Sequence, residues 1–391
     1  MTDKPMNDEQ TPYATPSIRA IDLLMLLADS GIKRLTGVPC SSMIGLINMA
    51  QSSSILRYAN APNEGEALAY AAGAWLGGQR AAVLCQNSGL GNLYNCLTSL
   101  CIPYKIPTLI LCGWRGMPGI SDEPQHKVMG SITEALFSSI DVPCNILKPN
   151  SDIRKVISSD HFDKRKSLAV LISPNAFESA SADSLAASPM TEGTLDKRPG
   201  SPKLNRLEVI RLVSKLAGLN VGVVVSTGLL SREYFAQAND NNLLCMAGSM
   251  GHTAALGLGA YAASDVPILV IEGDGSVLMR PQGMIFVASK RPSSFCHLVI
   301  DNAVHESTGG QPTLSPMIDL AKAAIAFGYR HAVDTVDADV ALEVANHGLT
   351  GGGPVFVRLR ILGGGKTPPR IDMPFSEMAS RFRNHLCAIS T

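Results

Sequence analysis

Short apolar runs that alternate with helix-like segments restrict the possible folds of this chain more than any other feature. The first half contains three such runs, each about as long as a buried strand, at 80–86, 107–114 and 168–174. A segment with the spacing of an amphipathic helix, residues 18–31, precedes them and ends at a glycine. Strands that alternate with helices are typical of a mainly parallel sheet with helices on both faces. The sequence therefore predicts a doubly wound α/β domain over residues 1–175.

The alternation stops at residues 176–203 and then resumes. This stretch is rich in Ser, Ala, Asp, Gly and Pro, so we predict a linker, with a long loop inside one domain as the alternative. Beyond it, a second domain of the same α/β type is predicted over residues 204–391, with no central domain between the two. Its pattern indicates a helix at 204–217, strands near 220–228, 265–275, 294–302 and 353–362, and helices at 252–263, 281–290, 317–327 and 337–347.

Composition excludes some classes of protein. Lys and Arg together number 33, as do Asp and Glu, which disfavours nucleic-acid and membrane-surface binding because both usually require a basic excess. No apolar run is as long as a membrane span, and the polar N-terminus lacks the apolar core of a signal peptide. The nine cysteines show no CxxC spacing, so we expect a cytoplasmic protein with free thiols. Seven of them lie in or beside apolar segments: Cys40, Cys85, Cys96, Cys101, Cys112, Cys245 and Cys296.

An acidic residue lies between two glycines directly after one of the apolar runs. Asp274 follows "ILVIE" within "GDGS", and the next run, "HLVID", leads to Asn302, 28 positions further along. Because neighbouring parallel strands end side by side, these two side chains can face one cation, and their oxygens suit Mg²⁺ or Ca²⁺. Gly273 and Gly275 allow a ligand to approach the backbone, and Ser276 with the following helix start offers N–H groups to an anion. The alternative for this stretch is a plain turn.

The arrangement resembles the diphosphate–magnesium motif of the thiamine-diphosphate-dependent 2-oxo acid decarboxylase family, which begins with GDG and ends in Asn. The resemblance implies that the main-chain carbonyl of Val304 is a further Mg²⁺ ligand. It also implies that Glu64, in "NEGEA", hydrogen-bonds the pyrimidine ring of thiamine diphosphate and helps the cofactor to lose a proton, with Glu66 as the fallback. An exposed acidic helix start is the ordinary interpretation of these two residues.

A third stretch, "AGSMGHTAALGLGAYAA", fits the same family. Met250 matches the bulky apolar residue that bends the cofactor, and Gly248 belongs to the same cofactor-binding segment; a core methionine is the alternative. The stretch also contains "GLGAYA", which is typical of dinucleotide-binding loops, but those glycines lie inside a predicted helix. A Rossmann-type nicotinamide oxidoreductase and an inactive binding module therefore stay as alternatives from other classes, and both leave the Asp274–Asn302 pair unexplained.

Longer stretches narrow the family. "GVPCS", "NEGEA", "QNSGLGN", "WRGMPGISDEPQHKVMG" and "DNAVHESTGGQPT" resemble the phosphonopyruvate decarboxylases, with the sulfopyruvate decarboxylases as the nearest alternative. The resemblance implies conversion of 3-phosphonopyruvate to phosphonoacetaldehyde and carbon dioxide, a step of phosphonate biosynthesis. It also implies a homodimer or higher homo-oligomer whose active sites lie between subunits.

A substrate that carries a carboxylate and a phosphonate needs cations and hydrogen-bond donors. Arg115 follows an apolar run, and its guanidinium could bind a phosphonate through two hydrogen bonds, although a surface arginine is the alternative. His126, in a polar loop, is a candidate proton carrier, and His305 is a second. His252 could reach the cofactor or be structural. The substrate-binding candidates are Ser41, Asn87, Arg115, Gln125 and His126.

Overall fold

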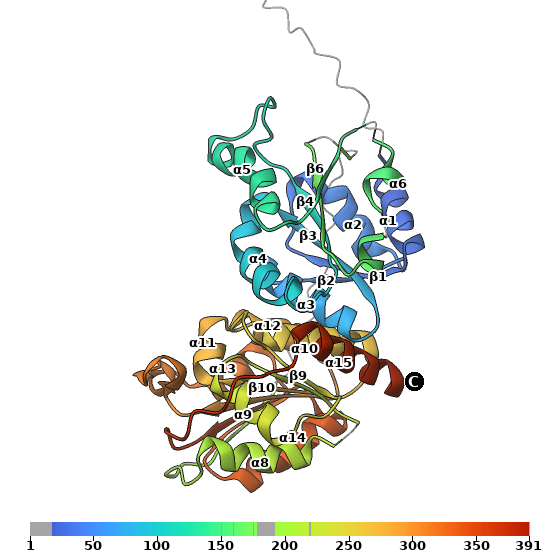
Figure 1. Ribbon diagram of the computed structural model, residues 1–391. Coiled ribbons are helices and arrows are strands. Elements are labelled where there is room, and N and C mark those ends of the chain that lie inside the picture. The colour runs from blue at the N-terminus through green and yellow to red at the C-terminus, as the bar shows by residue number, and fades with distance from the viewer. Residues whose placement is uncertain are drawn as a thin grey trace, which may run out of the picture.

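Two parallel β-sheets, one in each half of the chain, form the framework of the protein (Figure 1). The computed structural model describes residues 18–149, 151–158, 160–174, 176–177, 192–218 and 220–390. In Figure 1 the N-terminal domain lies above the C-terminal domain, and helix α3 (Glu64–Leu76) of the first packs on helix α10 (Thr253–Ser264) of the second. The predicted fold class, two doubly wound α/β domains without a central domain, is confirmed.

The N-terminal sheet has six strands, and every neighbouring pair is parallel. Along the third strand in sequence, Val83 and Cys85 belong to one core cluster, whereas Ala82 and Leu84 belong to the other. Both faces of the sheet are therefore covered, as expected for a parallel sheet. Across the sheet the strands are β2 (Arg57–Asn60), β1 (Ile32–Gly37), β3 (Arg80–Gln86), β4 (Leu109–Gly113), β6 (Leu168–Ile172) and β5 (Cys144–Leu147). Besides α3, the helices are α1 (Ala20–Asp29), α2 (Ile44–Ser52), α4 (Leu90–Cys96), α5 (Lys127–Ser138), α6 (Ile153–Val156) and α7 (Asp160–Asp163).

The C-terminal sheet has seven parallel strands. Their order across the sheet is β7 (Thr194–Lys197), β14 (His331–Thr335), β15 (Val355–Arg360), β11 (Phe295–Asp301), β10 (Ile268–Gly273), β8 (Gly222–Val225) and β9 (Leu243–Cys245). Besides α10, the helices are α8 (Arg206–Leu216), α9 (Leu229–Gln237), α11 (Asp274–Met279), α12 (Gln282–Lys290), α13 (Leu320–Phe327), α14 (Ala338–His347) and α15 (Phe375–Ile389). A hairpin of β12 (Val304–His305) and β13 (Gln311–Pro312) follows β11.

Strand β7 corrects part of the predicted linker at residues 176–203. Thr194 pairs with His331, so the end of that stretch forms the edge of the C-terminal sheet. The pattern did not reveal this strand because an exposed edge strand needs no apolar run, and "TLDK" contains one leucine. Residues 178–191 lie outside the described residues. The other predicted limits, 1–175 and 204–391, stay predictions.

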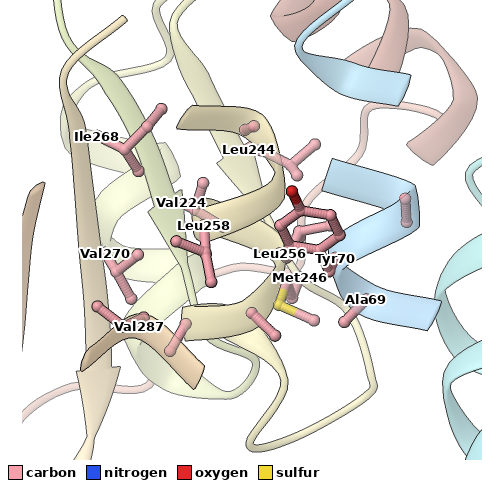
Figure 2. Packing of buried hydrophobic residues seen from close by; sticks show 14 of the residues in the cluster. Ala69, Tyr70, Val224, Leu244, Met246, Leu256, Leu258, Ile268, Val270 and Val287 are labelled. Carbon is pink, nitrogen blue, oxygen red and sulfur yellow. The ribbon is translucent and has the colours of Figure 1, made fainter. Parts of the chain in front are cut away.

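Small residues allow α3 and α10 to approach closely at the domain junction. A Cβ on Gly73 would lie 1.9 Å from Leu256 O, and a Cβ on Gly259 would lie 2.0 Å from Tyr70 O. Figure 2 shows Tyr70 of α3 beside Leu256 of α10. Gly257, the first glycine of "GLGAYA", packs on β10, since its Cβ would be 2.5 Å from a Val270 methyl. These glycines therefore serve helix packing, and the resemblance of "GLGAYA" to a dinucleotide loop is fortuitous.

The cysteine prediction is confirmed, because all nine are free and the seven expected to be buried are buried. Among the described residues, no helix combines the length and the apolar character that crossing a membrane requires.

Candidate active site

A pocket of about 550 Å³, partly open to solvent, lies at the carboxyl edge of the C-terminal sheet. Loops that follow the adjacent strands β8, β10 and β11 form its walls. Gly273 at the end of β10 pairs with Ile300 near the end of β11, so these strands end at the same level. This is the edge at which parallel α/β sheets bind ligands. Most of the predicted cofactor and metal residues line the pocket, namely Met250, Gly273, Asp274, Gly275, Ser276, Asn302 and Val304.

Asp274 is the first residue of α11, and its side chain is buried. Burial raises the pKa of Asp274, against the hydrogen bond that its carboxylate accepts from the Thr313 hydroxyl. Its neighbour Asp301 already has a cation, because Arg358 Nε donates to it at 2.7 Å. No basic side chain among the described residues pairs with Asp274. Asp274 is therefore the acid at this edge whose charge is left for a bound cation.

The turn after β11 presents the other predicted metal ligands. Ala303 adopts a left-handed conformation with φ 61°, and the Val304 N–H donates to Asn302 Oδ1 at 3.1 Å. That oxygen retains a second lone pair. The described residues hold no group of three or more His, Cys, Asp or Glu side chains placed to bind a metal. The donors here are instead one carboxylate, one amide oxygen and one main-chain carbonyl, a set of hard oxygens that fits Mg²⁺.

The two residues that follow Asp274 make close contacts with other segments of the pocket. A Cβ on Gly275 would lie 2.4 Å from His305 Cε1, so the imidazole of His305 lies against the glycine backbone at the pocket. The Ser276 hydroxyl donates to Glu272 Oε1 at 2.7 Å and accepts from the Gly251 N–H at 3.0 Å. That hydroxyl joins β10 to the segment containing Met250, a use that sequence reasoning did not predict.

The segment around Met250 connects the pocket to the N-terminal domain. A Cβ on Gly248 would lie 2.7 Å from Ser99 Cβ, and the hydroxyls of Ser249 and Ser99 hydrogen-bond at 2.7 Å. His252 is fully buried, and burial lowers its pKa to about 4. It is therefore a neutral imidazole packed at the domain junction.

Glu64 begins α3 at the same junction. Its Oε2 accepts from Asn92 Nδ2 at 2.9 Å, and its Oε1 lies against Gly89, where a Cβ would be 2.1 Å away. The next residue, Gly65, contacts the C-terminal domain, since its Cβ would lie 2.6 Å from His252 Nε2. A single chain thus already brings the first turn of α3 to the segment that carries Met250.

Glu66 differs sharply from Glu64. It is fully buried, and neither carboxylate oxygen has a hydrogen-bond partner among the described residues. Burial, and then the charge of Glu272, raise the pKa of Glu66 to about 8. Glu272 itself hydrogen-bonds His297 at 2.8 Å, and both are buried. Glu66 is therefore a neutral acid inside the domain junction at pH 7.

The predicted substrate residues gather at the carboxyl edge of the N-terminal sheet, where the adjacent strands β1, β3 and β4 end. Arg115 follows β4, and its Nη1 donates to Ser41 Oγ at 3.2 Å. Asn87 follows β3 and is fully buried; its Nδ2 donates to the Arg115 carbonyl at 2.7 Å and to Thr133 Oγ1 at 3.0 Å. The amide of Asn87 is thus engaged by protein groups and supports the main chain at Arg115, while its predicted role toward the substrate stays a prediction.

The sequence analysis did not predict Asp122 as a residue of the site. It accepts from Arg115 Nε at 2.8 Å and Nη2 at 2.5 Å, and from the Gly116 N–H at 2.7 Å. The Arg115 guanidinium holds the pKa of Asp122 well below its usual range. The available signal was an acid within the glycine-bounded polar loop that follows Arg115.

Gln125 and His126 form a short 3₁₀-helix (Pro124–His126) at the end of that loop, before α5. Gln125 is exposed and His126 is half-buried. A Cβ on Gly116 would lie 2.1 Å from the His126 carbonyl oxygen, so the two ends of the loop are packed together. Both side chains are thus carried by a loop that folds back on Arg115.

Arg206 and Glu306 also line the pocket and were not predicted. Arg206 is in the first turn of α8, where the helix dipole disfavours a cation. A basic residue in that position is the signal that sequence reasoning could have used.

Comparisons with known proteins agree with this geometry. Two models of thiamine pyrophosphate enzymes match the chain, the N-terminal TPP binding domain over residues 20–135 and the C-terminal TPP binding domain over residues 226–359. The phosphonopyruvate decarboxylase of Streptomyces viridochromogenes is 38% identical over 382 residues, which cover 94% of each chain. The sulfopyruvate decarboxylase of Methanosarcina acetivorans is 24% identical over 93% of this chain and 96% of that protein.

A solved structure supports the fold. Benzoylformate decarboxylase from Polynucleobacter necessarius aligns with a TM-score of 0.69 over 90% of this chain and 100% of that chain, at 13% identity. At this identity the likeness concerns the arrangement of helices and strands alone.

Proposed function

This chain belongs to the thiamine pyrophosphate enzymes, in the family of its phosphonopyruvate decarboxylase relatives, and from this premise we propose that it converts 3-phosphonopyruvate to phosphonoacetaldehyde and carbon dioxide. Relatives of that name from two Streptomyces species are each 38% identical to it over 94% of its length. The structural observation that carries the proposal is the buried carboxylate of Asp274, which lacks a basic partner among the described residues and lies at a strand end beside the Asn302 turn.

The pocket residues fit thiamine diphosphate and Mg²⁺. Asp274, Asn302 and the Val304 carbonyl would hold the cation, and the backbone at Gly273, Gly275 and Ser276 would face the diphosphate. Met250 lines the pocket and would contact the body of the cofactor, and Gly248 is assigned to the same segment by the resemblance to the family. When bound, thiamine diphosphate supplies a nucleophilic carbon for the oxo group and takes up the electrons left by carbon dioxide.

Glu64 is the residue that we assign to the pyrimidine ring. Asn92 holds one of its carboxylate oxygens, and the other packs against Gly89, where a Cβ would lie 2.1 Å away. A carboxylate that is already held in place can hydrogen-bond a ring nitrogen without moving from its position. Glu66 lacks such access because it is fully buried.

The anionic end of the substrate would bind at the edge of the N-terminal sheet. Asp122 occupies Nε and Nη2 of Arg115, and Nη1 is directed to Ser41, so a phosphonate would contact the Nη1–Ser41 side. Gln125 and His126 follow on the same loop. We assign proton transfer to His126 at this edge and to His305 at the pocket.

We further propose a homodimer or higher homo-oligomer with active sites between subunits, in the cytoplasm. The support is the family and a group of exposed apolar side chains on α11 and the segment that follows β13. Met279 is 56% exposed, Leu314 61% and Met317 83%. Exposed apolar groups beside a pocket are typical of a surface that another subunit covers.

The test is the release of aldehyde and carbon dioxide from phosphonopyruvate, sulfopyruvate and pyruvate, each with and without thiamine diphosphate and Mg²⁺. Turnover of phosphonopyruvate that requires both additions is the expected result. Faster turnover of sulfopyruvate would keep the chemistry and replace the substrate. Turnover that is indifferent to thiamine diphosphate would contradict the proposal.

A further inference from the structure

Arg206 is a buried cation that contacts two acidic side chains at the cofactor pocket. Its Nε donates to Glu233 and its Nη1 donates to Glu306, and the side chain of Arg206 is only 7% exposed. Helix α8 does not need this arginine, because Asn205 and Glu208 already form its capping box. The helix dipole also opposes a cation there. The position of Arg206 must therefore be explained by its contacts with segments outside α8.

Glu306 lines the pocket, and Glu233 belongs to a different segment that begins beside it. Glu233 lies on α9, which begins directly after the pocket residues Thr227 and Gly228. Glu306 follows His305 and lies four positions after Asn302, in the loop that carries the metal ligands. Arg206 thus links the β8–α9 wall to the metal-binding turn.

A third segment, near the C-terminus, also contacts the carboxylate of Glu306. The Gly364 N–H donates to Glu306 Oε1 at 2.5 Å, while Oε2 of that carboxylate faces Arg206. A Cβ on Gly363 would lie 3.6 Å from a Val304 methyl and 3.9 Å from the Asn302 carbonyl oxygen. The C-terminal strap, residues 361–365, therefore crosses the turn that holds the predicted metal ligands. Gly364, with φ 92°, suits this path because other residues rarely adopt that conformation.

The charges of Arg206 and its acidic partners would affect a diphosphate bound in the pocket. A bound diphosphate would share the pocket with Glu306, which would repel it if this carboxylate were unpaired. Arg206 bonds to Glu306 and to Glu233, and the strap N–H completes the partners of Glu306. Loss of Arg206 would therefore both release the metal-binding turn and expose the diphosphate to the unpaired carboxylate of Glu306.

We infer that Arg206 is a positioning residue for the cofactor: acting through Glu306, it holds the metal-binding turn and the C-terminal strap in the geometry that retains thiamine diphosphate and Mg²⁺. The inference rests on the proposed cofactor pocket and is independent of the identity of the substrate.

The first test compares Glu306→Gln with Glu343→Gln, a matched control on the exposed surface of α14. Mutation of a residue that hydrogen-bonds a metal-binding group typically lowers metal affinity or activity by about 10-fold to 100-fold. We expect Glu306→Gln to raise the Kd for thiamine diphosphate at saturating Mg²⁺, and its dissociation rate, by about tenfold. A Kd and dissociation rate equal to those of the control would overturn the inference.

Two further measurements separate positioning from a general structural role. Arg206→Met should raise the Kd more than Glu306→Gln does; a smaller effect in a folded variant contradicts the charge argument. Trypsin cleavage after Lys366 or Arg370, next to the strap, should be slowed by cofactor and Mg²⁺ in the wild type but much less in Glu306→Gln. Equal protection in both would contradict the role of the strap. None of these readouts uses a substrate, so failure of the phosphonopyruvate assay would leave them informative.

Discussion

The two edges that supply the site are built differently. At the C-terminal sheet, buried strand ends and a short turn place Asp274 and Asn302, which accept hydrogen bonds from the Thr313 hydroxyl and the Val304 N–H respectively. At the N-terminal sheet, Arg115 is held by a loop whose main anchor is Asp122. Asp274 at the first edge is buried, whereas Gln125 at the second is exposed.

The difference separates two tasks. A cofactor that stays bound benefits from a pocket formed before binding, because little ordering is then needed. A substrate must enter and its product must leave, which favours a loop that can move. We therefore expect changes at the C-terminal edge to affect cofactor binding, and changes at the N-terminal edge to affect substrate turnover.

Asp274→Ala should have the largest effect. It removes the charged side chain that we propose as a metal ligand, so Mg²⁺-dependent retention of thiamine diphosphate should be abolished. Equilibrium dialysis with labelled cofactor measures this directly. Asp339→Ala, at an exposed site on α14, is the control and should behave as wild type. Unchanged retention in Asp274→Ala would remove the metal assignment.

Glu64→Gln should bind the cofactor normally and lose activity. A positioned acid–base group contributes about 10²-fold to 10⁴-fold to a rate, so kcat should fall by that factor while the cofactor Kd changes little. Glu66→Gln, two residues along the same helix, is the matched comparison. Near-normal turnover in Glu64→Gln, or an equal loss in Glu66→Gln, would show that Glu64 is not the group at the pyrimidine ring.

Asp122→Asn should act on the substrate alone. It replaces a carboxylate that accepts two charge-assisted bonds from Arg115, so the guanidinium loses its fixed orientation. We expect kcat/KM for phosphonopyruvate to fall about tenfold with no change in cofactor Kd. Glu123→Gln, an exposed neighbour, serves as the control. A rise in cofactor Kd would contradict the division between the two edges.

Glu66→Gln should have the smallest effect on activity and a distinct effect on stability. The folded state holds the Glu66 proton up to about pH 8, whereas an unfolded glutamic acid loses it near 4.5. This contribution is fully present below pH 4.5 and is lost as the pH rises towards 8, at up to about 1.4 kcal/mol per pH unit. Thermal melts from pH 5 to 9 should therefore show a weaker decline in the variant. Parallel curves would indicate that Glu66 is ionised in the folded protein.

Several site residues could be predicted because their placement follows from local rules. Asp274 and Asn302 each follow an apolar run, and parallel strands bring such ends together whatever the remaining sequence is. Glu64 could be named from the stretch around it, and Met250 in the same way. These predictions needed the position of a residue within one element and nothing about distant segments.

Other roles depended on contacts between distant parts of the chain. Asn87 donates to Thr133, 46 positions away, a contact that its place after β3 does not reveal. His252 is neutral because the domain junction buries it, and burial is a property of the assembled fold. Arg206 and Glu306 are separated by 100 positions. No local pattern encodes such pairs.

The sequence by itself determined the two α/β domains, the strand ends that line the pocket, and the family. Hydrophobic periodicity specifies elements, and the elements specify which edge of a sheet binds ligands. Only the tertiary structure decided which polar side chains are free. In the folded chain the side chains of Asn87 and Ser276 are hydrogen-bonded to other protein groups. Arg115 is hydrogen-bonded to Asp122, and Glu66 is buried. The reason is that burial and hydrogen-bond partners arise from segments far apart in the chain, and these set whether a polar group is charged and whether it can reach a ligand.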